Sequence, residues 1–182
     1  DARRLRRAPR AAQMIVVVMG VSGSGKTTIG RELAARLGCE FLDGDDFHPA
    51  ANVAKMAAGT PLSDEDRAPW LDRLNALLRE RAVRGESAVL ACSALKESYR
   101  ARLMHGVAEC RLVYLQGSVD LLRSRLAARQ HRYMPASLLE SQFAVLEPPQ
   151  DAIVIDVAAL SVRCVETIET RLAARDRANC KR

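Results

Sequence analysis

Aromatic residues are scarce in this chain, and its cysteines form no pattern that suggests a site. Phe, Trp and Tyr make up 4% of the 182 residues, so the core has to be built mainly from Ala, Leu and Val. No two cysteines form a CxxC pair, and none has a histidine at metal-ligand spacing. We therefore expect no disulfide framework and no zinc site. Five scattered thiols indicate a reducing, cytoplasmic location.

Long apolar runs are also missing. None approaches the roughly 18 consecutive apolar residues of a membrane helix, and no segment has the pattern of a secretory signal. With 48% hydrophobic and 27% charged residues, the composition is ordinary for a globular protein. We expect no membrane partner and a single domain over residues 14–182.

Positive charge is concentrated at the N-terminus. The net charge is +6, and residues 1–13 carry +4 of it, which leaves +2 for the other 169 residues. A nucleic-acid partner is not favoured, because the rest of the chain is nearly balanced. We expect residues 1–13 to be a solvated, disordered basic tail and Met14 to lie close to the functional start. A polyanion-binding arm and a short transit peptide stay open as alternatives.

Short apolar runs alternate with helical periods along the body of the chain. The apolar runs predict strands over residues 14–19, 39–43, 87–95, 111–117 and 152–157. Helical spacing predicts helices over residues 27–37, 48–85 with a break at 58–63, 96–106, 118–130, 135–147 and 161–178. Gly38 is typical of a helix stop, and Ser118 of an N-cap. This alternation predicts an α/β fold: a five-stranded parallel sheet with helices on both faces.

The segment GVSGSGKTT follows the first predicted strand and matches the pattern G-x-x-x-x-G-K-[ST]. In such a loop, glycines let successive N–H groups point inward and cradle a β-phosphate at the start of a helix. Lys26 would reach the β- and γ-phosphates, and the Thr27 hydroxyl would ligate Mg²⁺. The pattern predicts a site for a nucleoside triphosphate with magnesium, formed by Gly20, Val21, Ser22, Gly23, Ser24, Gly25, Lys26, Thr27 and Thr28.

Two carboxylates follow the second predicted strand, in the segment FLDGDDFHP. Asp43 and Asp45 stand at the carboxyl end of that strand, where open α/β sheets gather their ligands. The third predicted strand ends without an acidic residue, which is the arrangement of small P-loop metabolite kinases rather than of motors. We expect one carboxylate beside the metal and the other to accept a proton from the attacking hydroxyl. A solvated turn is the alternative.

Arginines mark a candidate lid over residues 123–140. Arg125 and Arg129 are four residues apart and share a helix face, ahead of the break QHRYMP. Arginine suits a migrating phosphoryl group, and a closing lid would keep water from it. A plain solvated basic face is the alternative.

The motifs together resemble the gluconokinase family, ATP-dependent kinases that make 6-phosphogluconate. The resemblance covers about residues 15–170 and rests on GVSGSGKTT, FLDGDDFHP, PLSDEDRAPWL, CSALKESYR and SRLAARQHRYMPASLLESQFAVLEPP in this order. It implies a three-layer P-loop kinase fold, ATP and Mg²⁺, gluconate as the acceptor, and a homodimer. It also implies Asp45 as the base, Asp43 near the magnesium, Lys26 and the lid arginines in catalysis, and a substrate-binding helical segment at about 47–85. The implied gluconate-binding residues are Asp45, His48, Lys55, Arg67, Trp70, Lys96 and Arg100.

Each of these assignments has a structural alternative. Arg67 could pair with Asp64 or Asp66 at the surface, Trp70 could belong to the core, and His48 could cap the next helix.

A related kinase for shikimate or a nucleoside monophosphate is the nearest enzyme alternative. A nucleotide-binding module without activity is the alternative from another class, and the presence of both strand-end carboxylates and lid arginines disfavours it.

Overall fold

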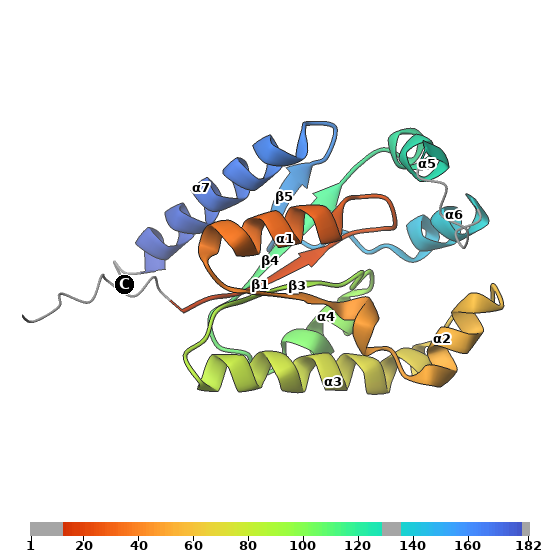
Figure 1. The fold of residues 1–182 in the computed structure, drawn as a ribbon, viewed down its shortest axis with the longest axis horizontal. Helices are drawn as coiled ribbons and strands as arrows, with labels where there is room; N and C mark the ends of the chain where they lie inside the picture. The colour runs from red at the N-terminus through yellow and green to blue at the C-terminus, as the bar shows by residue number, and fades with distance from the viewer. Residues whose placement is uncertain (1–12, 129–135, 180–182) are drawn as a thin grey trace, which may run out of the picture.

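The computed structural model describes residues 13–128 and 136–179. Its centre is a sheet of five parallel strands in the order β2-β3-β1-β4-β5 (Figure 1). All five predicted strands are present: β1 (Ile15–Met19), β2 (Glu40–Asp43), β3 (Ala88–Ala91), β4 (Cys110–Gln116) and β5 (Ile153–Asp156). Residues 1–12 of the basic tail, Arg129 and the whole break QHRYMP lie outside the described residues.

Helices cover both faces of the sheet. Helices α1 (Lys26–Leu37) and α7 (Ser161–Asn179) lie on one face, and α3 (Asp64–Val83) and α4 (Glu97–Met104) lie on the other (Figure 1). The remaining helices lie toward the carboxyl ends of the strands: η1 (Gly44–Phe47), α2 (Ala50–Ala57), α5 (Val119–Ala128) and α6 (Ala136–Val145). Among the described residues, none of these helices is both long and apolar enough to cross a bilayer.

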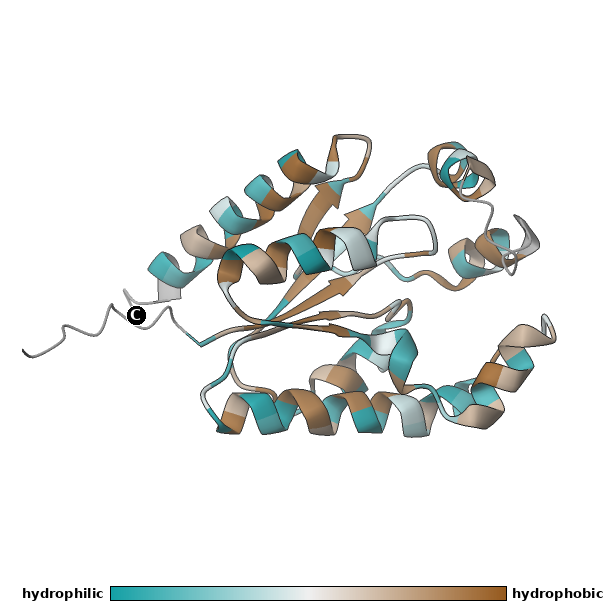
Figure 2. Ribbon diagram, in the orientation of Figure 1, coloured by the Kyte–Doolittle hydropathy of each residue, from teal (hydrophilic) through white to brown (hydrophobic). Residues whose placement is uncertain are grey.

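The sheet separates the core into two apolar clusters. All five residues of β1 are buried, and they alternate between the clusters: Val16 and Val18 face α1 and α7, whereas Ile15, Val17 and Met19 face α3 and α4. Burial on both faces explains why the parallel strands are continuous apolar runs. Figure 2 shows these strands as hydrophobic and the covering helices as two-sided. The four described cysteines are free thiols, as expected.

Several helix ends form where their residues predict. Gly38 adopts φ +63° after α1, and its N–H bonds to carbonyls of the last turn. The Ser118 hydroxyl accepts the N–H of Leu121 at 3.3 Å, which caps α5. At the start of α3, Ser63 and Asp66 form a reciprocal capping box.

The predicted strand over residues 87–95 is too long. β3 ends at Ala91, after which the N–H of Cys92 bonds to Val18 and the chain turns through Ala94 at φ +43°. The apolar residues after Ala91 are buried in a loop, and burial alone produces the same apolar pattern as a strand.

Gly44 provides a test of how tightly β2 leads into η1. A Cβ built on Gly44 would lie 2.7 Å from the main-chain oxygen of Ala91, which cannot move without disturbing β3. We expect Gly44→Ala to lower the free energy of unfolding by about 1–3 kcal/mol. The exposed neighbour offers the control, because Asp46→Ala should leave stability nearly unchanged. Urea denaturation of the two variants measures both effects, and equal stability would contradict this account of the packing.

Candidate active site

The loop between β1 and α1 is packed from both sides. A Cβ on Gly20 would lie 2.8 Å from the main-chain oxygen of Leu115, and Gly23, at φ +80°, would place one 3.0 Å from Leu126 of α5. These positions therefore leave no room for a side chain. The loop is a tight turn that leads into the first turn of α1, which is the positive end of the helix dipole.

Lys26 lies at the start of α1 and is half-buried. Its Nζ donates to the Val21 carbonyl at 3.1 Å, so the ammonium folds back over the loop. Burial lowers the pKa of Lys26, and the nearby carboxylates of Asp45 and Asp43 oppose that shift. A cation held over a ring of loop N–H groups fits a polyphosphate. Ser24 is fully buried beside it, and its Oγ has no hydrogen-bond partner among the described residues.

The two residues predicted to hold magnesium are in contact. The Thr27 hydroxyl donates to Asp43 Oδ2 at 3.0 Å, joining α1 to the end of β2. The described residues contain no group of three or more metal-ligating His, Cys, Asp or Glu. One hydroxyl and one carboxylate fit Mg²⁺, which completes its shell with water and substrate phosphates. Asp45 lies next to this pair: its N–H donates to Asp43 Oδ1 at 3.3 Å, and its carboxylate is 82% exposed.

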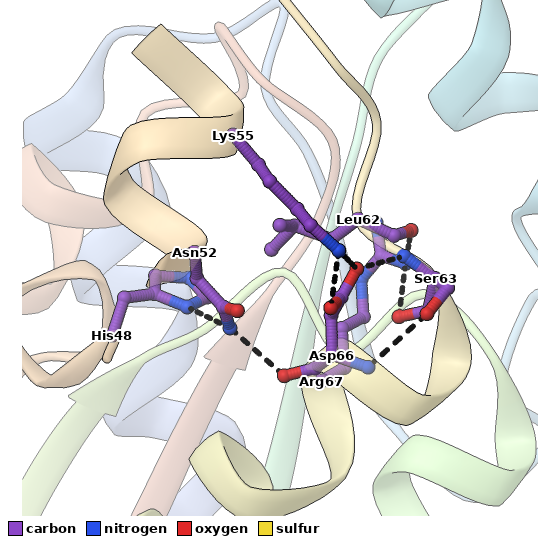
Figure 3. Close-up of polar contacts among 7 residues, drawn as sticks. All are labelled: His48, Asn52, Lys55, Leu62, Ser63, Asp66 and Arg67. Carbon is purple, nitrogen blue, oxygen red and sulfur yellow. Dashed lines mark hydrogen bonds and ion pairs between the residues drawn. The ribbon is translucent and has the colours of Figure 1, made fainter. Parts of the chain in front are cut away.

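A polar network joins α2 to the start of α3 (Figure 3). The Asn52 amide is buried and donates through Nδ2 to the Asp66 carbonyl at 2.8 Å and lies 3.4 Å from His48 Nδ1. Lys55 pairs with the Asp66 carboxylate at 2.7 Å, which lowers the pKa of Asp66. The predicted residues Lys55 and His48 therefore belong to one network, and Asn52, which sequence reasoning missed, connects them to α3.

Arg67 and Trp70 extend this segment along α3. Arg67 donates to the carbonyls of Leu62 and Ser63 and is not in an ion pair with Asp64 or Asp66 in the described structure. Trp70 is 2% exposed and belongs to the core, as the alternative had it. Its Nε1–H donates to the Gly44 carbonyl at 2.8 Å, and the His48 ring stacks on it at 4.1 Å. Trp70 therefore supports the site from behind.

A second ion pair joins α3 to α4. Lys96 contacts both oxygens of Asp64 at 2.8 Å, and the Tyr99 hydroxyl donates to the same carboxylate. The hydrogen bond from Lys96, followed by that from Tyr99, lowers the pKa of Asp64. Lys55 of α2 and Lys96 before α4 thus each pair with a carboxylate of the first turn of α3.

Two of the predicted arginines use their hydrogen bonds on main-chain carbonyls. Arg100 is buried and donates to Ala94 and Leu95, and it lines a cavity of about 670 Å³ between α4, β4 and residues 147–151, away from the P-loop. Arg125 Nη2 donates to the Val157 carbonyl at 2.6 Å. Neither arginine contacts the P-loop residues in this conformation.

Gln142 of α6 is a second residue that sequence reasoning missed. Its Oε1 accepts the Ser22 N–H at 2.7 Å, and its Nε2 donates to the Ser22 hydroxyl at 2.9 Å. A single amide side chain therefore holds both the main chain and the side chain of one P-loop residue. The only signal in the sequence is the segment SLLESQFAVLE, which names no role for the glutamine.

Comparison with known proteins identifies gluconokinases among the relatives. A family model described as an AAA domain matches residues 15–149. The gluconokinase of Gluconobacter oxydans is 52% identical over 136 residues, which cover 75% of this chain and 76% of that protein. The thermosensitive gluconokinase of Escherichia coli is 46% identical over 145 residues, 78% of each chain.

Two solved structures have the same fold. A gluconokinase from Sinorhizobium meliloti superimposes with a TM-score of 0.82 at 39% identity, covering 91% of this chain and 94% of that one. A sugar kinase from Janibacter sp., solved without ligand, superimposes with a TM-score of 0.81 at 43% identity. The match covers 87% of this chain and 93% of that one. The architecture of the P-loop and its surroundings is therefore shared with sugar kinases.

The contact between Gln142 and Ser22 predicts a measurable effect on the P-loop. We expect Gln142→Ala to speed hydrogen exchange of the Ser22 amide by about fivefold, the equivalent of one lost hydrogen bond of about 1 kcal/mol. Ser141→Ala is the matched control, because the Ser141 hydroxyl donates only within its own helix, to Leu138. Equal exchange of the Ser22 amide in both variants would show that the contact does not restrain the loop.

Proposed function

The chain belongs to the gluconokinase family, and from this premise we propose that it transfers the γ-phosphoryl group of ATP to the terminal hydroxyl of D-gluconate, giving 6-phospho-D-gluconate and ADP. Within the site, the main support for this proposal is the contact between Thr27 and Asp43. It places a hydroxyl and a carboxylate that can bind a metal beside the P-loop lysine. Asp45 lies two residues further on, with its carboxylate open to an acceptor.

The P-loop binds and orients the nucleotide. Its N–H groups and the Lys26 ammonium would hold the β- and γ-phosphates, and Thr27 and Asp43 would hold Mg²⁺. Bound Mg²⁺ supplies charge neutralisation on the phosphates. Gln142 fixes Ser22 from the opposite side, so that the loop keeps its shape before the nucleotide arrives.

Asp45 acts on the acceptor. As the terminal hydroxyl attacks the γ-phosphorus, its proton passes to the Asp45 carboxylate, the new P–O bond forms, and the bond to the ADP oxygen breaks. The exposed position of Asp45 leaves its oxygens free for this contact. Water has to be excluded from the reaction, and we assign this role to the lid at about residues 123–140. In the closed lid, Arg125 would leave the Val157 carbonyl and bind a phosphoryl oxygen, together with Arg129.

The paired charges of α3 suit a hydroxylated acid. Lys55, Lys96 and Arg67 are cations that a carboxylate can approach, and Asp64 and Asp66 accept hydrogen bonds from hydroxyl groups. Gluconate carries one carboxylate and several hydroxyls, so its carboxylate can pair with one of these cations while its hydroxyls donate to the aspartates. His48 lines the same segment, whereas Trp70 and Arg100 act from behind it.

The remaining assignments are the domain boundaries, the location and the oligomeric state. We propose one kinase domain over residues 14–182, a cytoplasmic location and a homodimer. The family resemblance is the support for the homodimer. Light scattering should give twice the 20.0 kDa of one chain. A mass of one chain at micromolar concentration would refute the dimer.

ADP release measured with several acceptors tests the function. Gluconate should give turnover, whereas shikimate and nucleoside monophosphates should not. Preference for either of those acceptors would replace gluconate with a different substrate of the same fold, and ADP release that no acceptor stimulates would leave only nucleotide binding.

The neighbouring carboxylates should differ in their phenotypes. We expect Asp45→Asn to lower kcat by about 10²–10⁴-fold while ATP still binds, because the amide cannot accept the proton. Asp43→Asn should be partly rescued by excess Mg²⁺, because its defect acts through the metal. Asp46→Asn is the matched control, since Asp46 is exposed in the same turn. If Asp45→Asn kept kcat within a few-fold, or if magnesium rescued it instead of Asp43→Asn, the two roles would be wrong.

A further inference from the structure

The His48 ring is held in place by two kinds of contact. It stacks on Trp70 with the ring planes 16° apart and the centroids 4.1 Å apart. The Trp70 indole is itself fixed by its hydrogen bond to Gly44. Stacking sets the plane of the imidazole, but it does not decide which ring nitrogen carries the proton.

Asn52 determines which ring nitrogen of His48 carries the proton. The Asp66 carbonyl can only accept, so the group of Asn52 that contacts it at 2.8 Å has to be the NH₂ of the amide. The same Nδ2 lies 3.4 Å from His48 Nδ1, so its second hydrogen is available to that nitrogen (Figure 3). Because Nδ1 faces a donor, it has to be the unprotonated nitrogen, and the ring proton resides on Nε2.

The protonated nitrogen faces Asp45. His48 Nε2 lies 4.0 Å from Asp45 Oδ1, and the His48 side chain is only 5% exposed. Burial is the largest influence on the protonation of the ring, and it opposes a second proton. Burial lowers the pKa of His48, and Arg67 of α3 lowers it further, whereas Asp45 of η1 raises it. A charged ring would also put Nδ1–H against the Asn52 NH₂.

We propose that Asn52 is a positioning residue for phosphoryl transfer: it fixes His48 as the neutral Nε2–H tautomer, so that an N–H group lies 4.0 Å from Asp45 Oδ1 and attracts the exposed carboxylate toward it. The role of Asp45 as the base rests on the proposed function. The tautomer rests on contacts of the chain alone. His48 thereby supplies a donor beside the base and does not compete with it for the proton.

Nitrogen-15 NMR of the full chain tests the tautomer directly. The sequence has three histidines, and His48→Gln identifies the signals of His48 by their loss. At neutral pH, long-range proton–nitrogen correlation should show an unprotonated Nδ1 and a protonated Nε2 for His48. A protonated Nδ1 in the unmodified protein would overturn the proposal, whatever any variant does.

Asn52→Asp tests the cause, and Asn75→Asp is its matched control. Asn75 lies on α3 and also donates through Nδ2 to main-chain carbonyls, those of Leu103 and His105, without contacting His48. A carboxylate at position 52 should draw the ring proton to Nδ1 and raise the pKa of His48 by about 1–3 units. Asn75→Asp should change neither.

Kinetics then separate positioning from a purely structural role. Asn52→Asp should lower kcat by up to about tenfold, because a base that is oriented differently accepts the proton less well, with an unchanged KM for ATP. Its loss should be larger below the raised pKa of His48 than above it. A kcat and a pH profile equal to those of Asn75→Asp would overturn the positioning role. A correct tautomer in a protein that does not phosphorylate gluconate would instead refute the proposed function.

Discussion

The parallel register of three strands is the constraint on which the rest of the site depends. β1 and β2 both pair with β3, and Val18 and Asp43 are both level with Ala91. Because parallel strands end at one edge of the sheet, the P-loop after β1 and the carboxylates after β2 emerge at the same edge, one on each side of β3. The hydrogen bond between Thr27 and Asp43 is the direct result. Gly44 makes the approach possible, since a Cβ there would meet the Ala91 oxygen.

Charge in the substrate segment is organised by pairing. Lys55 and Lys96 each contact a carboxylate of the first turn of α3. The dipole of α3 also stabilises negative charge at this end of the helix. Side chains that already have partners keep their geometry at little entropic cost when an acceptor arrives. The buried members of the site, Trp70 and Asn52, provide that geometry from behind. In the function proposed above, recognition of a polyol acid would exchange partners within this network.

Much of the fold could be predicted from the sequence, and less of the site. The strands and helices were predicted because buried parallel strands and amphipathic helices have distinct periods. Two exceptions were the length of β3, because the buried loop after Ala91 is as apolar as a strand, and the short helix η1, which was not predicted. The P-loop and the strand-end aspartates were also predicted, since their chemistry depends on local spacing. Gln142 and Asn52 were missed, because their partners Ser22 and Asp66 are distant in sequence.

The sequence by itself determined the phosphate-binding loop, the two carboxylates and the family to which they belong. Each of these depends on residue types at short range, where backbone conformation and spacing decide what a group can contact. Only the tertiary structure decided which predicted residues meet. It joined Thr27 to Asp43, buried Trp70 beneath His48, and directed Arg100 and Arg125 to carbonyls. Those outcomes depend on packing between elements far apart along the chain, and a one-dimensional pattern contains no record of such distances.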